Sequence, residues 1–166
     1  MFQAVRTVFA ATFTAALLVF AAAPDARANQ QSEAKALAEQ MIDDTYAVLS
    51  DGGLGEGEKF SRVHAVMSKL YDIETFDRRL LGSKTRAKLS DAEQAEFAKL
   101  LPRFLTSLFK ENFSRDLSRK AEVGEAKDFK GKGSTVAVSL PRTEGRMLPF
   151  FLYVNPENKI IDGATE

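Results

Sequence analysis

The spacing of apolar residues changes near Lys120, and this change limits the chain to few fold classes. Before that point apolar side chains recur every three to four residues, as on one side of an α-helix. After it they alternate with polar ones, as on a strand with one buried face. Helices that precede strands along a chain favour the α+β class, with an antiparallel sheet packed on helices. We therefore expect an α+β fold whose sheet is formed by the last part of the chain.

Four helices are expected in the first part. Their ranges are 31–50, 56–71, 72–82 and 91–117. The last begins with a capping box, because Ser90 and Glu93 are spaced so that each side chain can bond a backbone N–H group of the other. Its apolar residues cover an arc of about 220°, whereas an ordinary amphipathic helix shows a stripe upwards of ~100°. This surplus apolar surface indicates either an aromatic-rich core or a ligand pocket.

After Lys120 the chain is expected to form an antiparallel meander. The expected strands are 134–140, 146–154 and one that starts at 159, with a weaker candidate at 121–127 before them. The strand 146–154 is apolar at nearly every position, which indicates that both faces are covered or that one face lines a cavity. The residues leave open which face of this strand points inward.

Residues 1–28 have the pattern of a secretory signal peptide. A short positive start precedes an apolar run over 8–23, and Ala26 and Ala28 are the small residues that a signal peptidase reads. A retained membrane anchor is the alternative, although the run is shorter than the ~20 residues that span a bilayer. In both cases residues 29–166 are expected to form one domain that works outside the cytoplasm, in a bacterial periplasm.

Composition excludes several kinds of site. The chain has 23 basic and 23 acidic side chains and no cysteine. It therefore lacks the concentrated basic composition typical of nucleic-acid binding, and it cannot form a thiolate metal site. His64 is the only histidine, so no second one can share a metal or a proton with it. Within the expected strands 135–140 and 147–154 the only ionisable side chain is Tyr153. We expect no enzymatic activity, no cofactor and no metal.

The segment 71–113 resembles the MlaC or toluene-tolerance family of periplasmic phospholipid-binding proteins, which has hopanoid-associated relatives. The resemblance rests on "YDIE" at 71–74, on Leu81-Gly82, and on the helix start "LSDAEQAEF" at 89–97. The strand "LPFFLYV" and the following "NKIID" are also similar to the family's pattern. Relative to that pattern the chain ends early, at "DGATE", so we expect the domain to be truncated there.

This resemblance implies an NTF2-like cone, in which helices pack on a curved antiparallel sheet that encloses an apolar cavity. It also implies a monomeric carrier that shuttles phospholipid or a hopanoid-type lipid between an outer-membrane lipoprotein complex and an inner-membrane ABC transporter. The expected lipid-binding residues are Phe76, Leu81, Leu101, Leu105, Leu108, Phe109, Val136, Val138, Leu140, Phe151 and Tyr153. The surplus apolar surface of the long helix would then face partly the core and partly acyl chains. The alternative is an interaction module that docks an apolar groove on a membrane-protein partner without carrying lipid.

Overall fold

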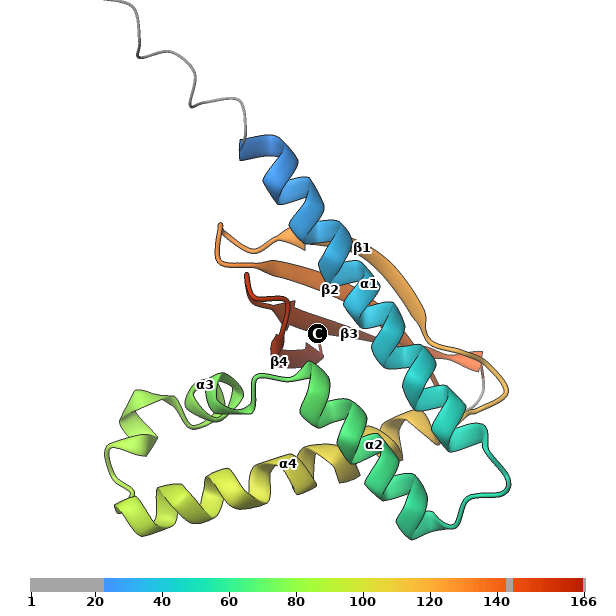
Figure 1. Cartoon of the computed structure of the whole chain (residues 1–166), viewed down its shortest axis with the longest axis horizontal. Helices are drawn as coiled ribbons and strands as arrows, with labels where there is room; N and C mark the ends of the chain where they lie inside the picture. The colour runs from blue at the N-terminus through green and yellow to red at the C-terminus, as the bar shows by residue number, and fades with distance from the viewer. Residues whose placement is uncertain (1–22, 143–144, 166) are drawn as a thin grey trace, which may run out of the picture.

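The computed structural model describes residues 23–142 and 145–165, in which four helices precede four strands (Figure 1). The helices are α1 (Ala23–Ser50), α2 (Glu56–Leu70), α3 (Ile73–Arg86) and α4 (Asp91–Phe113). The strands are β1 (Glu122–Asp128), β2 (Ser134–Pro141), β3 (Met147–Val154) and β4 (Ile160–Thr165). The α+β class that the apolar spacing predicts is therefore confirmed.

Three helix boundaries differ by several residues from those expected. Helix α3 continues to Arg86 instead of ending at Gly82, where φ is 65° and the helix is kinked. Helix α1 begins at Ala23 and so continues through Ala28, the last residue of the expected signal peptide, most of which lies outside the described residues. Helix α4 ends at Phe113, earlier than expected. The end is stabilised from outside the helix, because the Arg142 guanidinium donates a hydrogen bond to the backbone oxygen of Asn112. The capping box of Ser90 and Glu93 is confirmed.

The four strands form one open antiparallel sheet in the order β1-β2-β3-β4. In β2 and β3 the residue pairs that share the inward face are Val136 with Leu152, Val138 with Phe150, and Leu140 with Leu148. The first pair is wholly buried, with both side chains 0% exposed. Strand β1 has a bulge between Val123 and Ala126 and forms one edge of the sheet.

The helices form a second layer that covers the inward face unevenly (Figure 1). Helix α1 packs on β1 and β2, and α2 packs on α1 and α4. Helix α3 packs on β4, whereas α4 contacts the sheet mainly at β2. The core lies where α1, α2 and the middle strands meet. Its largest fully buried side chains include Met41, Ile42, Val63, Val136 and Leu152.

The residues that join α2 to α3 connect the helices to the other edge of the sheet. Tyr71 forms a parallel bridge with Ile160, and the backbone N–H of Asp72 donates to the Ile160 oxygen at 2.9 Å. The Asp72 carboxylate caps α3 by accepting a hydrogen bond from the backbone N–H of Thr75 at 2.9 Å. The Tyr71 hydroxyl donates to the sulfur of Met41, 3.8 Å away. This junction thus fixes α2, α3 and β4 relative to one another.

Replacing Asp72 by alanine removes the cap of α3 and leaves the backbone bond to Ile160. We expect a loss of about 1 kcal/mol of unfolding free energy near neutral pH, the usual value of an N-cap. The hydrogen bonds from Thr75 hold the pKa of the Asp72 carboxyl below its usual range. This stabilisation is therefore present above the pKa of the unfolded chain and is lost as pH falls through the lowered folded-state pKa. Urea unfolding of both proteins should show the difference near neutral pH and a smaller one near pH ~2; an equal difference would contradict the assignment.

Gly133 closes the β1–β2 hairpin in a conformation that only glycine adopts easily. Its φ is 125°, and a Cβ at this position would clash with the backbone oxygen of Val154. We expect Gly133→Ala to lower the unfolding free energy by roughly 2–4 kcal/mol. The control is Gly131→Ala in the same hairpin, where φ is 69° and nothing lies within 4 Å. Gly131→Ala should lower the unfolding free energy by only about 1–2 kcal/mol. If urea unfolding shows the same loss of unfolding free energy for both variants, the clash at Gly133 is absent.

Candidate functional site

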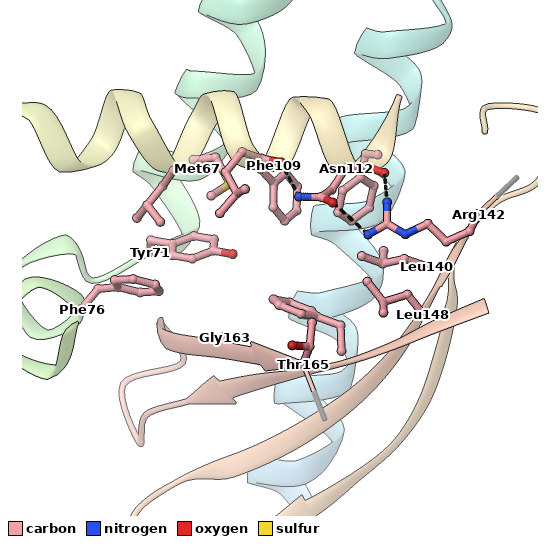
Figure 2. Close-up of a pocket in the computed structure, with 14 residues that line it drawn as sticks. Met67, Tyr71, Phe76, Phe109, Asn112, Leu140, Arg142, Leu148, Gly163 and Thr165 are labelled. Atoms are coloured by element: carbon pink, nitrogen blue, oxygen red, sulfur yellow. Dashed lines mark hydrogen bonds between the residues drawn. The ribbon is translucent and has the colours of Figure 1, made fainter. Parts of the chain in front are cut away.

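An apolar pocket of about 310 Å³ lies between α4 and the inward face of the sheet (Figure 2). Its walls come from α2, α3 and α4 on one side and from β2, β3 and β4 on the other. The lining residues are Met67, Tyr71, Phe76, Leu105, Leu108, Phe109, Asn112, Phe113, Leu140, Arg142, Leu148, Phe150, Gly163 and Thr165.

Helix α4 provides one wall because its inward residues recur at helical spacing. Leu105, Phe109 and Phe113 are four residues apart, so their side chains lie above one another on one side of the helix. The rings of Phe109 and Phe113 are stacked with their centroids 4.2 Å apart. Leu108 also lines the pocket but is 47% exposed, so it marks the side where the pocket opens to solvent.

A glycine on β4 makes room for an aromatic ring in the opposite wall. A Cβ at Gly163 would lie 2.6 Å from the Cζ atom of Phe150, which shows that the ring lies directly against the glycine. Both residues line the pocket. A larger residue at 163 would therefore move the ring of Phe150, and the size of the pocket depends on this contact.

Two polar side chains, Asn112 and Arg142, meet at one end of the pocket (Figure 2). The Arg142 guanidinium donates to the side-chain oxygen of Asn112 at 2.8 Å and to its backbone oxygen at 3.2 Å. The Asn112 amide in turn donates to the backbone oxygen of Leu108 at 2.7 Å. Burial lowers the pKa of Arg142, and the nearby positive charge of Arg115 lowers it further. Burial raises the pKa of the deeper Tyr71 phenol further above neutral pH.

The pocket wall offers shape and apolar contact rather than acid-base groups. Among the described residues that line it, Tyr71 and Arg142 are the only ionisable side chains, with no carboxylate or imidazole. His64 lies elsewhere, with Nδ1 at 2.9 Å from the Thr106 hydroxyl oxygen. That hydroxyl donates to the backbone oxygen of Pro102, so Nδ1 acts as the donor and the histidine joins α2 to α4.

Within residues 23–142 and 145–165, no three His, Asp or Glu side chains are grouped so that they could hold a metal ion. No helix in the same part of the chain combines the length and the apolar character that crossing a membrane requires.

Five of the sequence-predicted site residues line the pocket: Phe76, Leu105, Leu108, Phe109 and Leu140. The other six lie elsewhere. Leu101, Val136 and Val138 are buried in the core, and Leu81 is half-buried on α3.

The remaining two, Phe151 and Tyr153, are on the outward face of β3. They pair with Ala137 and Thr135, which alternate with the inward residues of β2. The ring of Tyr153 instead packs against Phe129, with centroids 5.0 Å apart. Phe151 and Tyr153, expected to bind lipid together with Val136 and Val138, thus lie on the opposite face of the sheet from them. The sequence left the face open, because β3 is apolar on both faces.

The surplus apolar surface of α4 is also placed differently from the expectation. An exposed stripe runs along the side of α4 that points away from the core. It consists of three residues spaced four apart, Leu100, Phe104 and Leu108. Their exposed fractions are 53%, 60% and 47%. Only Leu108 also reaches the pocket. Most of the surplus therefore faces solvent rather than the core or the pocket.

Sequence reasoning missed most of the sheet wall and the polar end. Leu148 and Phe150 could have been found from their alternation with Leu152, once one residue of β3 was known to point inward. Asn112 and Arg142 gave no such signal, because they are 30 positions apart and meet only through the fold.

Comparison with known proteins assigns no family. No protein-family model matches the chain, and no curated protein shows significant similarity to it.

Replacing Gly163 by alanine should make the pocket smaller and leave the sheet paired. The added methyl group would push the Phe150 ring off β4 and into the pocket, since a ring can rotate where backbone cannot move. We expect the neutral apolar dye N-phenylnaphthylamine to bind roughly four- to fifteen-fold more weakly, because each CH₂-sized volume lost costs ~0.8 kcal/mol. Gly124→Ala in β1 is the control, since its Cβ would meet Ala137 at an ordinary 3.4 Å. Unchanged dye binding in the Gly163 variant would contradict the role of this contact.

Proposed function

We propose that the protein is a periplasmic lipid carrier that holds an acyl chain in the pocket between α4 and the sheet. The observation that carries this proposal is the apolar wall, in which aliphatic and aromatic side chains predominate and no acid-base pair is present. Such a wall recognises a ligand by its apolar area and not by reaction chemistry. In this proposal the helices and the sheet correspond to an NTF2-like cone, and the pocket is its cavity.

The volume supports a ligand of acyl-chain size. At 310 Å³ the pocket lies at the small end of the usual range for ligand pockets. A cavity of ~150 Å³ binds benzene, so by proportion this pocket has room for roughly a dozen carbon atoms. At ~0.8 kcal/mol for each buried CH₂, a chain of this length contributes about 10 kcal/mol. That exceeds the lower estimates of the cost of association. One chain, rather than two, fits the described pocket.

The proposal includes a route for the lipid. The signal-peptide pattern of residues 1–28 would send the chain to the periplasm. The resemblance of segment 71–113 supports exchange of phospholipid or a hopanoid-type lipid with an outer-membrane lipoprotein complex and an inner-membrane ABC transporter. The exposed stripe supports such partners too, because Leu108 belongs both to the stripe and to the pocket wall. A partner that covers Leu100 and Phe104 would therefore also lie over the opening.

The same stripe favours the second candidate function, an interaction module that docks on a membrane-protein partner and carries no lipid. The two functions differ in whether the pocket is occupied. Native mass spectrometry of the protein purified from a bacterial periplasm, followed by lipid extraction, distinguishes them. We expect a bound species of phospholipid or hopanoid mass. A folded monomer without any bound lipid would support the interaction module instead.

A pair of tryptophan substitutions on α4 tests whether the lipid occupies this pocket. Leu108→Trp puts a larger side chain at the pocket wall, and we expect it to lower lipid occupancy roughly four-fold or more, since one CH₂ of lost burial is worth ~0.8 kcal/mol. The matched control is Leu100→Trp, at a residue of similar exposure that does not line the pocket. Equal lipid occupancy in both variants would place the lipid elsewhere.

A further inference from the structure

A hollow lined by three arginines adjoins the apolar pocket. Its lining residues are Arg115, Arg142, Arg146, Met147 and Leu148. Arg142 and Leu148 also line the pocket. The two spaces therefore meet at these two side chains, one space with an apolar wall and the other with a cationic one.

The backbone holds two of the arginines in place. The N–H of Arg142 donates to the oxygen of Arg146 at 2.9 Å, so the two residues face each other at the end of β2 and the start of β3. Arg119 donates to the backbone oxygens of both residues, at 3.4 and 3.3 Å, and ties this hairpin to the segment after α4. The backbone positions of Arg142 and Arg146 are therefore set by the fold, and the Arg142 side chain is held in addition by Asn112.

Arg142 has positive charge that its contacts within the described residues do not neutralise. Its guanidinium donates to two oxygens of Asn112, both of them uncharged (Figure 2). Among the described residues no carboxylate lies within ion-pair distance of it. Arg115 pairs with Glu111 at 2.9 Å, but both side chains are more than half exposed, so this pair is weak.

We propose that the ligand of the pocket is an anionic amphiphile, whose chain occupies the apolar space and whose phosphate or carboxylate head lies against Arg142, Arg115 and Arg146. This inference rests on the proposed lipid-carrier function and narrows its class of ligand. A guanidinium binds such a head through two parallel N–H groups, which fixes the orientation of the head as well as its charge. An anionic head would also offset the repulsion between the neighbouring cations Arg142 and Arg115.

Titration calorimetry with two ligands of the same chain tests the inference. Dodecyl phosphate and 1-dodecanol differ in the head, and their chain matches the estimated capacity of the pocket. We expect the phosphate to bind roughly ten-fold more tightly at low salt, the usual effect of a hydrogen bond to a charged group. Added salt should reduce this advantage, because part of it is electrostatic, and should not weaken binding of the alcohol.

Substitutions in the cationic wall locate the head. Arg115→Gln and Arg146→Gln each remove one charge and leave the contact between Arg142 and Asn112 in place. We expect each to reduce the advantage of the phosphate roughly three-fold and to leave dodecanol binding unchanged. The control is Arg103→Gln on α4, in a separate hollow beside Phe104. Circular dichroism melting checks that every variant folds.

Other results would overturn either the anionic-head inference or the proposed carrier function. If phosphate and alcohol bind equally, or if Arg103→Gln has the same effect as the wall variants, the anionic-head inference is wrong and the carrier function stands. If inorganic phosphate alone binds as tightly as dodecyl phosphate, the arginines hold a free anion and the inference is again wrong. If neither amphiphile binds, the proposed carrier function itself is wrong.

Discussion

The apolar inward face of the sheet must be covered, and the helices cover it only in part. Helix α1 packs along β1 and β2, whereas α4 approaches the sheet mainly at β2. The junction at Tyr71 and Asp72 bonds the opposite edge at Ile160 and thereby fixes where α2 ends and α3 begins. Leu148 and Phe150 of β3 are therefore left beside an open space, whereas Leu152 on the same face is buried in the core. The pocket, its polar end and the position of α4 all depend on this uneven covering.

Local sequence patterns determine the elements more clearly than they determine their contacts. The change of apolar period near Lys120 was enough to predict the α+β class, and the spacing of Ser90 and Glu93 was enough to predict where α4 begins. Both depend on neighbours within a few residues. The end of α4 was predicted less well, because Arg142 stabilises it from a distant part of the chain.

The candidate site was predictable where it lies on one helix and less so where it lies on the sheet. Leu105 and Phe109 follow from the helical period, since apolar residues at that spacing must share a face. Strand register decides whether Phe150 or Phe151 faces the pocket, and a strand that is apolar on both faces is compatible with either register. Likewise, the width of the apolar arc on α4 could not show that Phe104 points to solvent. Whether the side chain of Phe104 is covered depends on how far the sheet extends along the helix.

The two edges of the sheet differ in how they can meet another chain. At the β4 edge the backbone oxygen of Ile160 already accepts a hydrogen bond from Asp72. Among the described residues no strand pairs with the outer edge of β1. This edge is bulged and rich in charge, and Lys35 of α1 pairs with Glu125 there at 2.6 Å. Bulges and edge charges oppose the addition of a further strand. A chain that exposes apolar residues on α4 thus has a β1 edge that disfavours pairing with a strand of another molecule.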